Sequence, residues 1–166
     1  RNYTKSPLLT SEDILKKGEK TEGFELTWST DSKKILIKVI AKKHKYFILE
    51  IDKERNLIPL DFLRKNINEI SFDPENSQRI FFIEKSAEEN SLFSVVYAKK
   101  EISEPLLENI ISYQTFKGNL YWLNEEGFLI QSDLSGRKIR NFNLQPISLK
   151  KEAKYKIMVF QEEKIF

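Results

Sequence analysis

The 166-residue chain contains no cysteine, so it forms no disulfide bond, no thiolate metal site and no cysteine nucleophile. It has a single histidine, His44, which lies in a lysine-rich turn. One histidine without a cysteine partner does not make a transition-metal centre. We therefore expect no metal site, and we expect His44 to be a surface turn residue.

Glycine is also scarce, and five glycines cannot supply a Gly-x-Gly-x-x-Gly or Walker phosphate loop. No Gly-x-Ser-x-Gly sequence is present to expose a serine nucleophile. A Ser-His-Asp triad would have to use His44 with Asp31 or Asp52. Adjacent glutamates in predicted turns do not face each other across a substrate as glycosidase carboxylates do. These pairs are Glu88-Glu89, Glu125-Glu126 and Glu162-Glu163. We expect no catalytic residue and no bound cofactor.

Long apolar runs and strong charge imbalance are both missing. No apolar stretch approaches the length of a membrane span. The net charge is only +3, and the lysine pairs are spread along the chain instead of forming a basic stripe. We expect neither a membrane span in this segment nor a nucleic-acid partner.

Apolar triplets, in contrast, recur at intervals of 40 to 45 residues along the whole chain. They are Ile35-Leu36-Ile37, Ile80-Phe81-Phe82, Leu120-Tyr121-Trp122 and the terminal Ile165-Phe166. A strand and a polar turn precede each triplet, and a third strand and a weaker fourth strand follow the first three. Such a period predicts stacked repeat units. The second strands carry apolar residues on both faces, which is typical of a strand buried on both sides.

The sequence therefore predicts an all-β fold: a partial β-propeller of about three four-stranded antiparallel blades, with incomplete flanking blades. The expected units are 1–22 (outer strand and linker of a preceding blade), 23–61, 62–108, 109–146 (three blades) and 147–166 (first hairpin of a further blade). One or two helical turns are expected within 10–18, where a threonine cap and early acids precede lysines and glycine. The outer strands include 57–60, 104–107 and 138–142, and two of these contain proline, which is confined to sheet edges.

The turns between first and second strands resemble those of TolB-like and WD-type propeller repeats. The matching segments are Trp28-Ser29-Thr30-Asp31 and Phe72-Asp73-Pro74. The third unit resembles a YWTD-type blade, because Tyr121-Trp122-Leu123-Asn124 is similar to Tyr-Trp-Thr-Asp. Position 123 is Leu instead of Thr, and position 124 is Asn instead of Asp. The resemblance implies a propeller and, by similarity to TolB-like proteins, a bacterial protein that lies in the cell envelope or periplasm.

Aromatic residues recur on or near the first strands and on one second strand. We expect Trp28, Phe72, Tyr113 and Trp122 to pack between blades or to lie on a binding surface. The resulting prediction is a non-catalytic binding or scaffold module that contacts another protein. The alternatives are the non-catalytic propeller of a prolyl-oligopeptidase-type peptidase and a ligand- or sugar-sensing propeller. Because the sequence begins with Arg1 and not Met, we expect further blades in a longer parent chain, and we expect residues 1–166 alone to self-associate.

Overall fold

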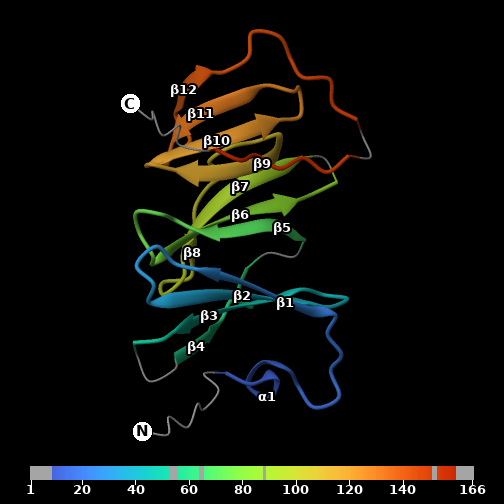
Figure 1. Ribbon diagram of the computed structural model, residues 1–166, viewed down its shortest axis with the longest axis vertical. Coiled ribbons are helices and arrows are strands. Elements are labelled where there is room, and N and C mark those ends of the chain that lie inside the picture. Colours follow the sequence, from blue (N-terminus) through green and yellow to red (C-terminus); the bar gives the residue numbers. More distant parts are fainter. Residues whose placement is uncertain (1–8, 53–55, 64–65, 88, 151–152, 160–166) are drawn as a thin grey trace, which may run out of the picture. The chain divides into compact units, whose positions relative to one another are not determined.

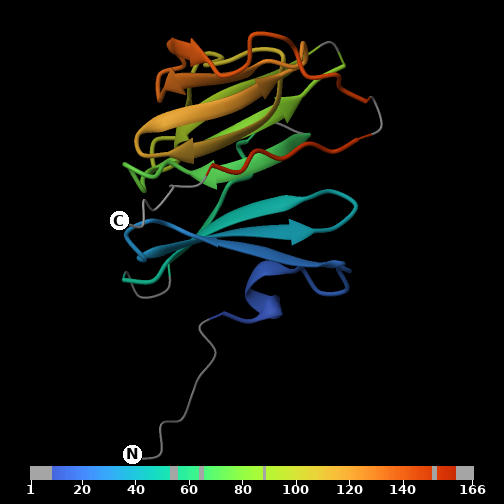
Figure 2. The ribbon, with the colours of Figure 1, turned by 45° about the horizontal axis from the view of Figure 1, so that its top comes forward.

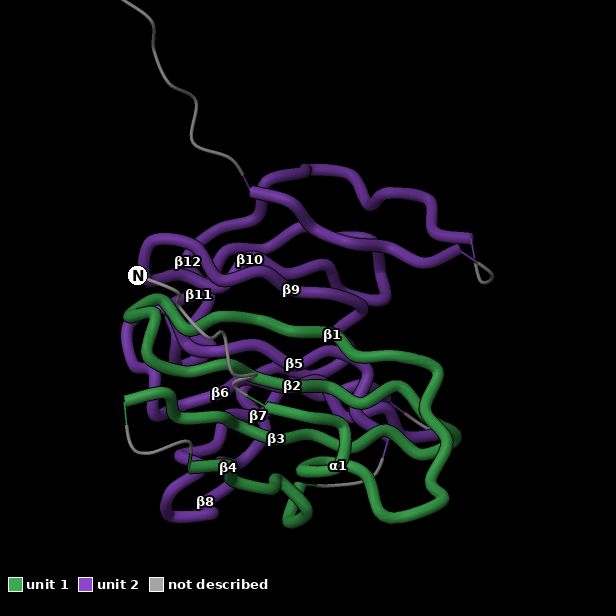
Figure 3. The backbone as a smooth tube through the Cα atoms, turned by 60° about the horizontal axis from the view of Figure 1, so that its bottom comes forward, with its two compact units in different colours: residues 1–63 green, residues 64–166 purple. Residues whose placement is uncertain are grey.

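The computed structural model describes residues 9–52, 56–63, 66–87, 89–150 and 153–159. These residues form one short helix and three antiparallel sheets of four strands each, as labelled in Figure 1. The chain divides into two compact units, residues 1–63 and 64–166, which Figure 3 shows in two colours. The first unit holds one sheet and the second unit holds two.

Each sheet is a four-stranded meander in which neighbouring strands pair antiparallel. The first sheet contains β1 (Gly23–Trp28), β2 (Lys34–Ile40), β3 (Lys45–Glu50) and β4 (Asn56–Pro59). The second contains β5 (Ile67–Phe72), β6 (Arg79–Lys85), β7 (Asn90–Val96) and β8 (Glu101–Ile102). The third contains β9 (Ile110–Phe116), β10 (Asn119–Asn124), β11 (Leu129–Asp133) and β12 (Lys138–Asn141). The prediction of an all-β chain with three four-stranded antiparallel sheets is confirmed.

Within the second unit the two sheets pack face to face (Figure 2). Phe81 and Ile83 of β6 contact Tyr113, Trp122 and Ile130 of the third sheet in one buried cluster. Alternate residues of a strand point to opposite faces, so this contact uses one face of each sheet. The third sheet therefore keeps its other face, which carries Tyr121, away from the second sheet.

The first sheet has a core of its own. Ile35, Ile37 and Val39 of β2 cluster with Phe47 and Leu49 of β3. The segment around α1 (Ser11–Ile14) packs on this cluster through residues Leu9, Ile14 and Leu15. The helix begins after Thr10, whose backbone N–H and hydroxyl both donate to the Asp13 carboxylate, at 2.7 and 2.8 Å. This local bonding explains why one helical turn forms where the sequence predicts it.

The outer strand of the second sheet lies earlier than expected. It was predicted over 104–107, but β8 spans Glu101–Ile102, and only an isolated bridge joins Leu92 to Leu107. Pro105 has no N–H to donate, so the ladder cannot run continuously through it. Around this interruption, Leu92 donates to the Leu107 carbonyl and Leu106 donates to the Leu92 carbonyl, both at 2.8 Å.

The chain ends differ from the expected strands as well. Residues 153–159 form no strand, although the first hairpin of a further blade was predicted within 147–166. A ladder needs a partner strand, and the predicted partner falls in residues 160–166, which lie outside the described residues. The start of the unit 1–22, which was predicted to hold the outer strand of a preceding blade, falls in residues 1–8, and these are also outside the described residues. No helix among the described residues is long and apolar enough to cross a membrane.

Candidate interaction surface

Strand β1 carries the most exposed apolar side chains of the first sheet. Phe24, Leu26 and Trp28 are 40, 62 and 56% exposed. They are spaced two residues apart, so they point to one face of the sheet. Opposite them on β2 lie Val39, Ile37 and Ile35, which belong to the buried core. We call Phe24, Leu26 and Trp28 the β1 stripe. The stripe lies on the same face of the first sheet as the buried core, but on an edge strand whose side chains are exposed.

The repeat shows what the corresponding position does elsewhere. Leu26 pairs with Ile37 in the first sheet, and Tyr113 pairs with Trp122 in the third. Tyr113 and Trp122 are only 8 and 9% exposed, because the second sheet covers that face. The β1 stripe thus has the chemistry of a face that packs against protein.

The four aromatic residues predicted as packing or binding groups therefore separate into two kinds. Trp28 is exposed on β1, whereas Phe72, Tyr113 and Trp122 are buried. Trp122 donates its indole N–H to Ser132 Oγ at 2.9 Å, in a buried hydrogen bond. Tyr113 and Trp122 pack between two sheets of the second unit. Of the four, Trp28 is the residue that a partner can reach.

Tyr113 also organises a polar contact between β5 and β9. Its hydroxyl lies 2.8 Å from Ser71 Oγ and 3.0 Å from the carbonyl oxygen of Phe81, to which it donates. Burial raises the pKa of this phenol far above its ordinary value. The phenol is therefore neutral, and it acts as a structural hydrogen-bond donor.

Beside it, Glu69 accepts hydrogen bonds from Ser112 Oγ at 3.1 Å and from the Tyr113 backbone N–H at 3.5 Å. Burial raises the pKa of this carboxyl, and the two bonds and the charge of Lys156 oppose that shift. Such a perturbed carboxyl can mark a catalytic site. Among the described residues, no group of three or more His, Cys, Asp or Glu side chains gathers to hold a metal. Ser112 and Tyr113 belong to β9, so the Glu69 carboxylate on β5 joins the second sheet to the third by hydrogen bonds.

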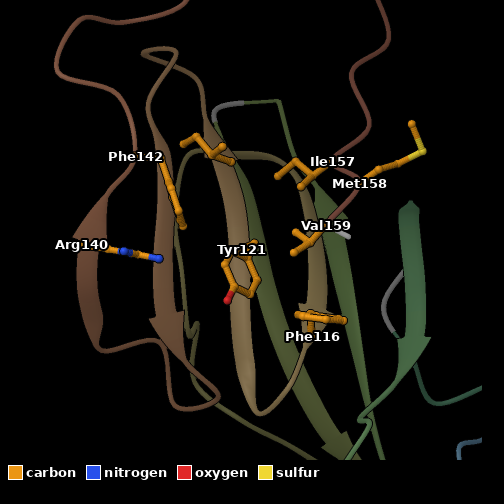
Figure 4. A pocket seen from close by; sticks show the side chains of 8 residues that line it. Phe116, Tyr121, Arg140, Phe142, Ile157, Met158 and Val159 are labelled. Atoms are coloured by element: carbon orange, nitrogen blue, oxygen red, sulfur yellow. The ribbon is translucent and has the colours of Figure 1, made fainter. Parts of the chain in front are cut away.

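A second surface lies on the open face of the third sheet. There, a groove of about 370 Å³ lies between the sheet and residues 157–159. Its lining residues are Phe116, Tyr121, Leu129, Arg140, Phe142, Ile157, Met158 and Val159. We call it the third-sheet groove. In Figure 4, Ile157 and Val159 point toward Tyr121, and Arg140 lies alongside Phe142. The Arg140 guanidinium carbon is 4.4 Å from the centre of the Phe142 ring, which is a cation–π distance.

A short hydrogen bond joins residues 157–159 to this face. The Val159 backbone N–H donates to Gln114 Oε1 of β9 at 2.6 Å. Gln114, Tyr121, Gln131 and Arg140 are cross-strand neighbours and form a row across the sheet. Two members of this row, Tyr121 and Arg140, line the groove, and the other lining residues are apolar.

Sequence reasoning missed Phe24, Leu26 and most of the groove. The alternation Phe24-x-Leu26-x-Trp28 is a usable signal of a contact face. A strand face that only meets solvent would carry polar residues at these three positions. The groove residues carry no such signal, since Phe116, Tyr121 and Phe142 come together only through sheet pairing. His44 is exposed in its turn, and His44, Asp31 and Asp52 are not part of either surface.

Comparison with known proteins bears on the fold alone. No protein-family model matches the sequence, and no curated protein matches it. A crystal structure of the eukaryotic initiation factor matches with a TM-score of 0.52 and 15% identity, over 76% of this chain and 34% of that one. TolB from Acinetobacter baumannii matches with a TM-score of 0.49 and 11% identity, over 66% and 29%. A Nidogen/Laminin complex matches with 0.36 and 10%, over 69% and 60%.

These structures are β-propellers, and the initiation factor is the match that supports the assignment of fold. With three four-stranded antiparallel sheets, the chain has the fold of a partial β-propeller. It spans about a third of the length of the initiation factor chain that it matches. The similarity to TolB-like, WD-type or YWTD-type repeats stays a prediction, because short sequence patterns alone carry it.

Proposed function

We propose that this chain is a non-catalytic β-propeller module that binds another protein, and that the β1 stripe is a contact surface. The observation that carries this proposal is the exposure of Phe24, Leu26 and Trp28 on one face of one strand. Contiguous exposed apolar side chains favour protein contact. Tryptophan in particular is enriched at the centres of interfaces.

The proposal is tested by capture from an extract of the source organism. The baits are the wild-type chain, Leu26→Glu, and Thr27→Glu as the matched control. Thr27 is exposed on the same strand but points to the opposite face. We expect at least one protein to be retained by wild type and Thr27→Glu, and to be reduced about tenfold or more on Leu26→Glu. Identical protein sets on all three baits would contradict the proposal.

A second candidate function is ligand sensing in the third-sheet groove. Its volume of about 370 Å³ is in the range of small-molecule sites. Tyr121 offers an aromatic face on which a sugar ring can stack, and Arg140 and Gln131 offer hydrogen-bond donors nearby. Saturation-transfer NMR with neutral and acidic oligosaccharides tests this function. Tyr121→Ala should abolish the signal, and Leu144→Ala, at a fully exposed position outside the groove, should leave it intact.

The division of the chain into units remains part of the proposal: 1–22, 23–61, 62–108, 109–146 and 147–166. The bond from Val159 to Gln114 supports the last unit, because it joins residues 45 positions apart, and the bond from Tyr113 to Glu69 joins residues 44 positions apart. In both cases a backbone N–H of the later segment donates to a side chain of the first strand of the preceding sheet, although the two acceptors, Glu69 and Gln114, lie two residues apart in the repeat. The similar sequence separation is what a further blade within 147–166 would produce.

A further inference from the structure

Strand β1 is an open edge as well as an apolar one. Among the described strands it pairs only with β2, and it is the first strand in its sheet. Ser29 donates its backbone N–H to the Lys34 carbonyl at 3.0 Å, so Ser29 and Lys34 form a hydrogen-bonded pair. Hydrogen-bonded and non-hydrogen-bonded pairs alternate along an antiparallel ladder. The register has no shift, so Phe24, Leu26 and Trp28 direct their backbone N–H and C=O groups away from β2.

Natural sheet edges are usually protected by lysine, proline, bulges or short length. The outer edges of this chain follow that rule, since β4 contains Pro59, β8 has two residues, and β12 contains Lys138 and Arg140. Strand β1 reads Gly-Phe-Glu-Leu-Thr-Trp, with no lysine, arginine or proline. It is also exposed along nearly its whole length, unlike β5 and β9, which are the first strands of the other two sheets. This edge therefore lacks the features that prevent pairing.

From these observations we infer that the occupant of the β1 edge is the β1 strand of a second copy, paired antiparallel about a two-fold axis at Leu26. This inference rests on the proposed function of the β1 stripe as a protein contact. The two-fold axis places Leu26 opposite Leu26 of the other copy, and Phe24 opposite Trp28. These residues have outward-pointing backbone groups, so each pair exchanges two backbone hydrogen bonds. The same pairing brings the apolar side chains together on one face.

The other face of the paired strands is compatible with this register. Glu25 lies opposite Thr27 of the second copy, so no like charges oppose each other directly. The two Glu25 side chains are diagonal neighbours, and each already has a cation partner, because Lys38 Nζ lies 3.0 Å from Glu25 Oε2. The sequence is thus self-complementary in the way that a closed two-fold interface requires.

The test uses the absence of cysteine from the chain. Directly opposed residues of a hydrogen-bonded pair have Cα atoms about 5.5 Å apart, which suits a disulfide. Leu26→Cys should therefore form a disulfide-linked dimer under mild oxidation at micromolar protein. Thr27→Cys is the matched control, since Thr27 is diagonal to its own copy, about 7–8 Å away, and should cross-link at least tenfold more slowly.

Sedimentation velocity on the purified 166-residue chain gives the second measurement. Wild type should show a concentration-dependent dimer. Leu26→Lys should weaken association about tenfold or more, whereas Thr27→Lys should change it less than about threefold. Phe24→Lys combined with Trp28→Glu should keep the dimer, because the axis pairs position 24 with position 28 and so pairs opposite charges. Near-ultraviolet circular dichroism confirms that each variant is folded.

The outcomes separate this inference from the proposed function. A monomer at all concentrations overturns the two-fold pairing. If capture from extract still depends on Leu26, the β1 stripe then binds a different protein, and the proposed function stands. Larger assemblies, or equal cross-linking of Leu26→Cys and Thr27→Cys, also overturn the pairing, because they require another contact. A dimer with the stated pattern of cross-linking and charge rescue supports it.

Discussion

Tyr113 and Ser71 are 42 residues apart in sequence, yet their hydroxyl oxygens lie 2.8 Å apart between strands β9 and β5. The Tyr113 hydroxyl also donates to the Phe81 carbonyl at 3.0 Å, and its ring packs edge-on against the Phe81 ring, with a centroid distance of 6.5 Å. A single side chain therefore joins the two sheets of the second unit by both apolar and polar contacts.

Tyr113→Phe should destabilise the second unit by about 1–2 kcal/mol, because the variant leaves buried polar partners without this hydroxyl. The free energy of unfolding in urea measures the effect. Tyr121→Phe is the matched control, since the Tyr121 ring is half-buried on the open face. Equal effects of the two substitutions would mean that the contact with Ser71 and Phe81 contributes nothing specific.

Glu69→Gln should change how stability depends on pH. Burial raises the pKa of Glu69 in the folded chain, so the folded state binds the proton more tightly than the unfolded state. The contribution of the protonated carboxyl is fully present below its ordinary pKa of 4.5 and is lost as pH rises through the higher folded pKa. Between pH 4 and pH 8, the urea midpoint of Glu69→Gln should therefore fall less than that of wild type.

The control for this pH series is Glu108→Gln, which neutralises an exposed glutamate. Its profile should follow that of wild type. A Glu69→Gln profile parallel to wild type across the whole range would contradict a raised pKa at Glu69.

Gly127→Ala should be more destabilising than Gly18→Ala, although both glycines have left-handed backbone conformations, with φ of +89° and +82°. A side chain at Gly127 would overlap the carbonyl oxygen of Ile147, whereas Gly18 faces open space. The shared backbone strain costs about 1 kcal/mol. The overlap should bring the Gly127 variant to about 2–4 kcal/mol in urea unfolding. Equal losses would show that residue 147 moves away freely.

Asp73→Ala should cost more than Asp31→Ala, although the two residues belong to equivalent turns of successive sheets. The Asp73 side chain is fully buried and accepts from Arg79 Nε at 2.6 Å. The Asp31 side chain is 36% exposed and lies 3.5 Å from Lys34 Nζ. Removing the buried Asp73 carboxylate leaves the charge of Arg79, whose side chain is only 31% exposed, without this partner, so about 2–3 kcal/mol is expected for Asp73. About 0.5–1 kcal/mol is expected for Asp31. The reverse order in thermal unfolding would refute this reasoning.

The sequence predicted the sheets well because each strand carries its own signal. Ile80-Phe81-Phe82-Ile83 is apolar on both faces, and all four residues are fully buried. Turn residues such as Gly118 and Asn76 lie between paired strands and mark where each hairpin turns. Outer strands are shorter and partly polar, so their sequence signal is weaker. The position of β8 was predicted wrongly because Pro105 interrupts the hydrogen-bond ladder, and local sequence patterns do not show on which side of the proline the strand forms.

The surfaces were harder to predict because exposure depends on neighbours. Trp28 and Tyr113 occur on the first strands of their sheets. The alternation around Trp28 marks an apolar face, but it does not say that Trp28 is 56% exposed and Tyr113 8%. The difference arises from the second sheet, which covers Tyr113. The groove residues Phe116 and Phe142 are brought together by strand pairing over 26 positions, which no local pattern encodes.

The two tryptophans of the chain give each compact unit its own optical reporter. Trp28 lies in water-accessible surroundings in residues 1–63, and Trp122 lies in a dry, hydrogen-bonded site in residues 64–166. Trp28 should fluoresce at longer wavelength and be quenched by iodide. Trp122 should fluoresce at shorter wavelength and be quenched little. Trp28→Phe and Trp122→Phe would then let the unfolding of each unit be followed separately, and would reveal whether the two melt in one transition or in two.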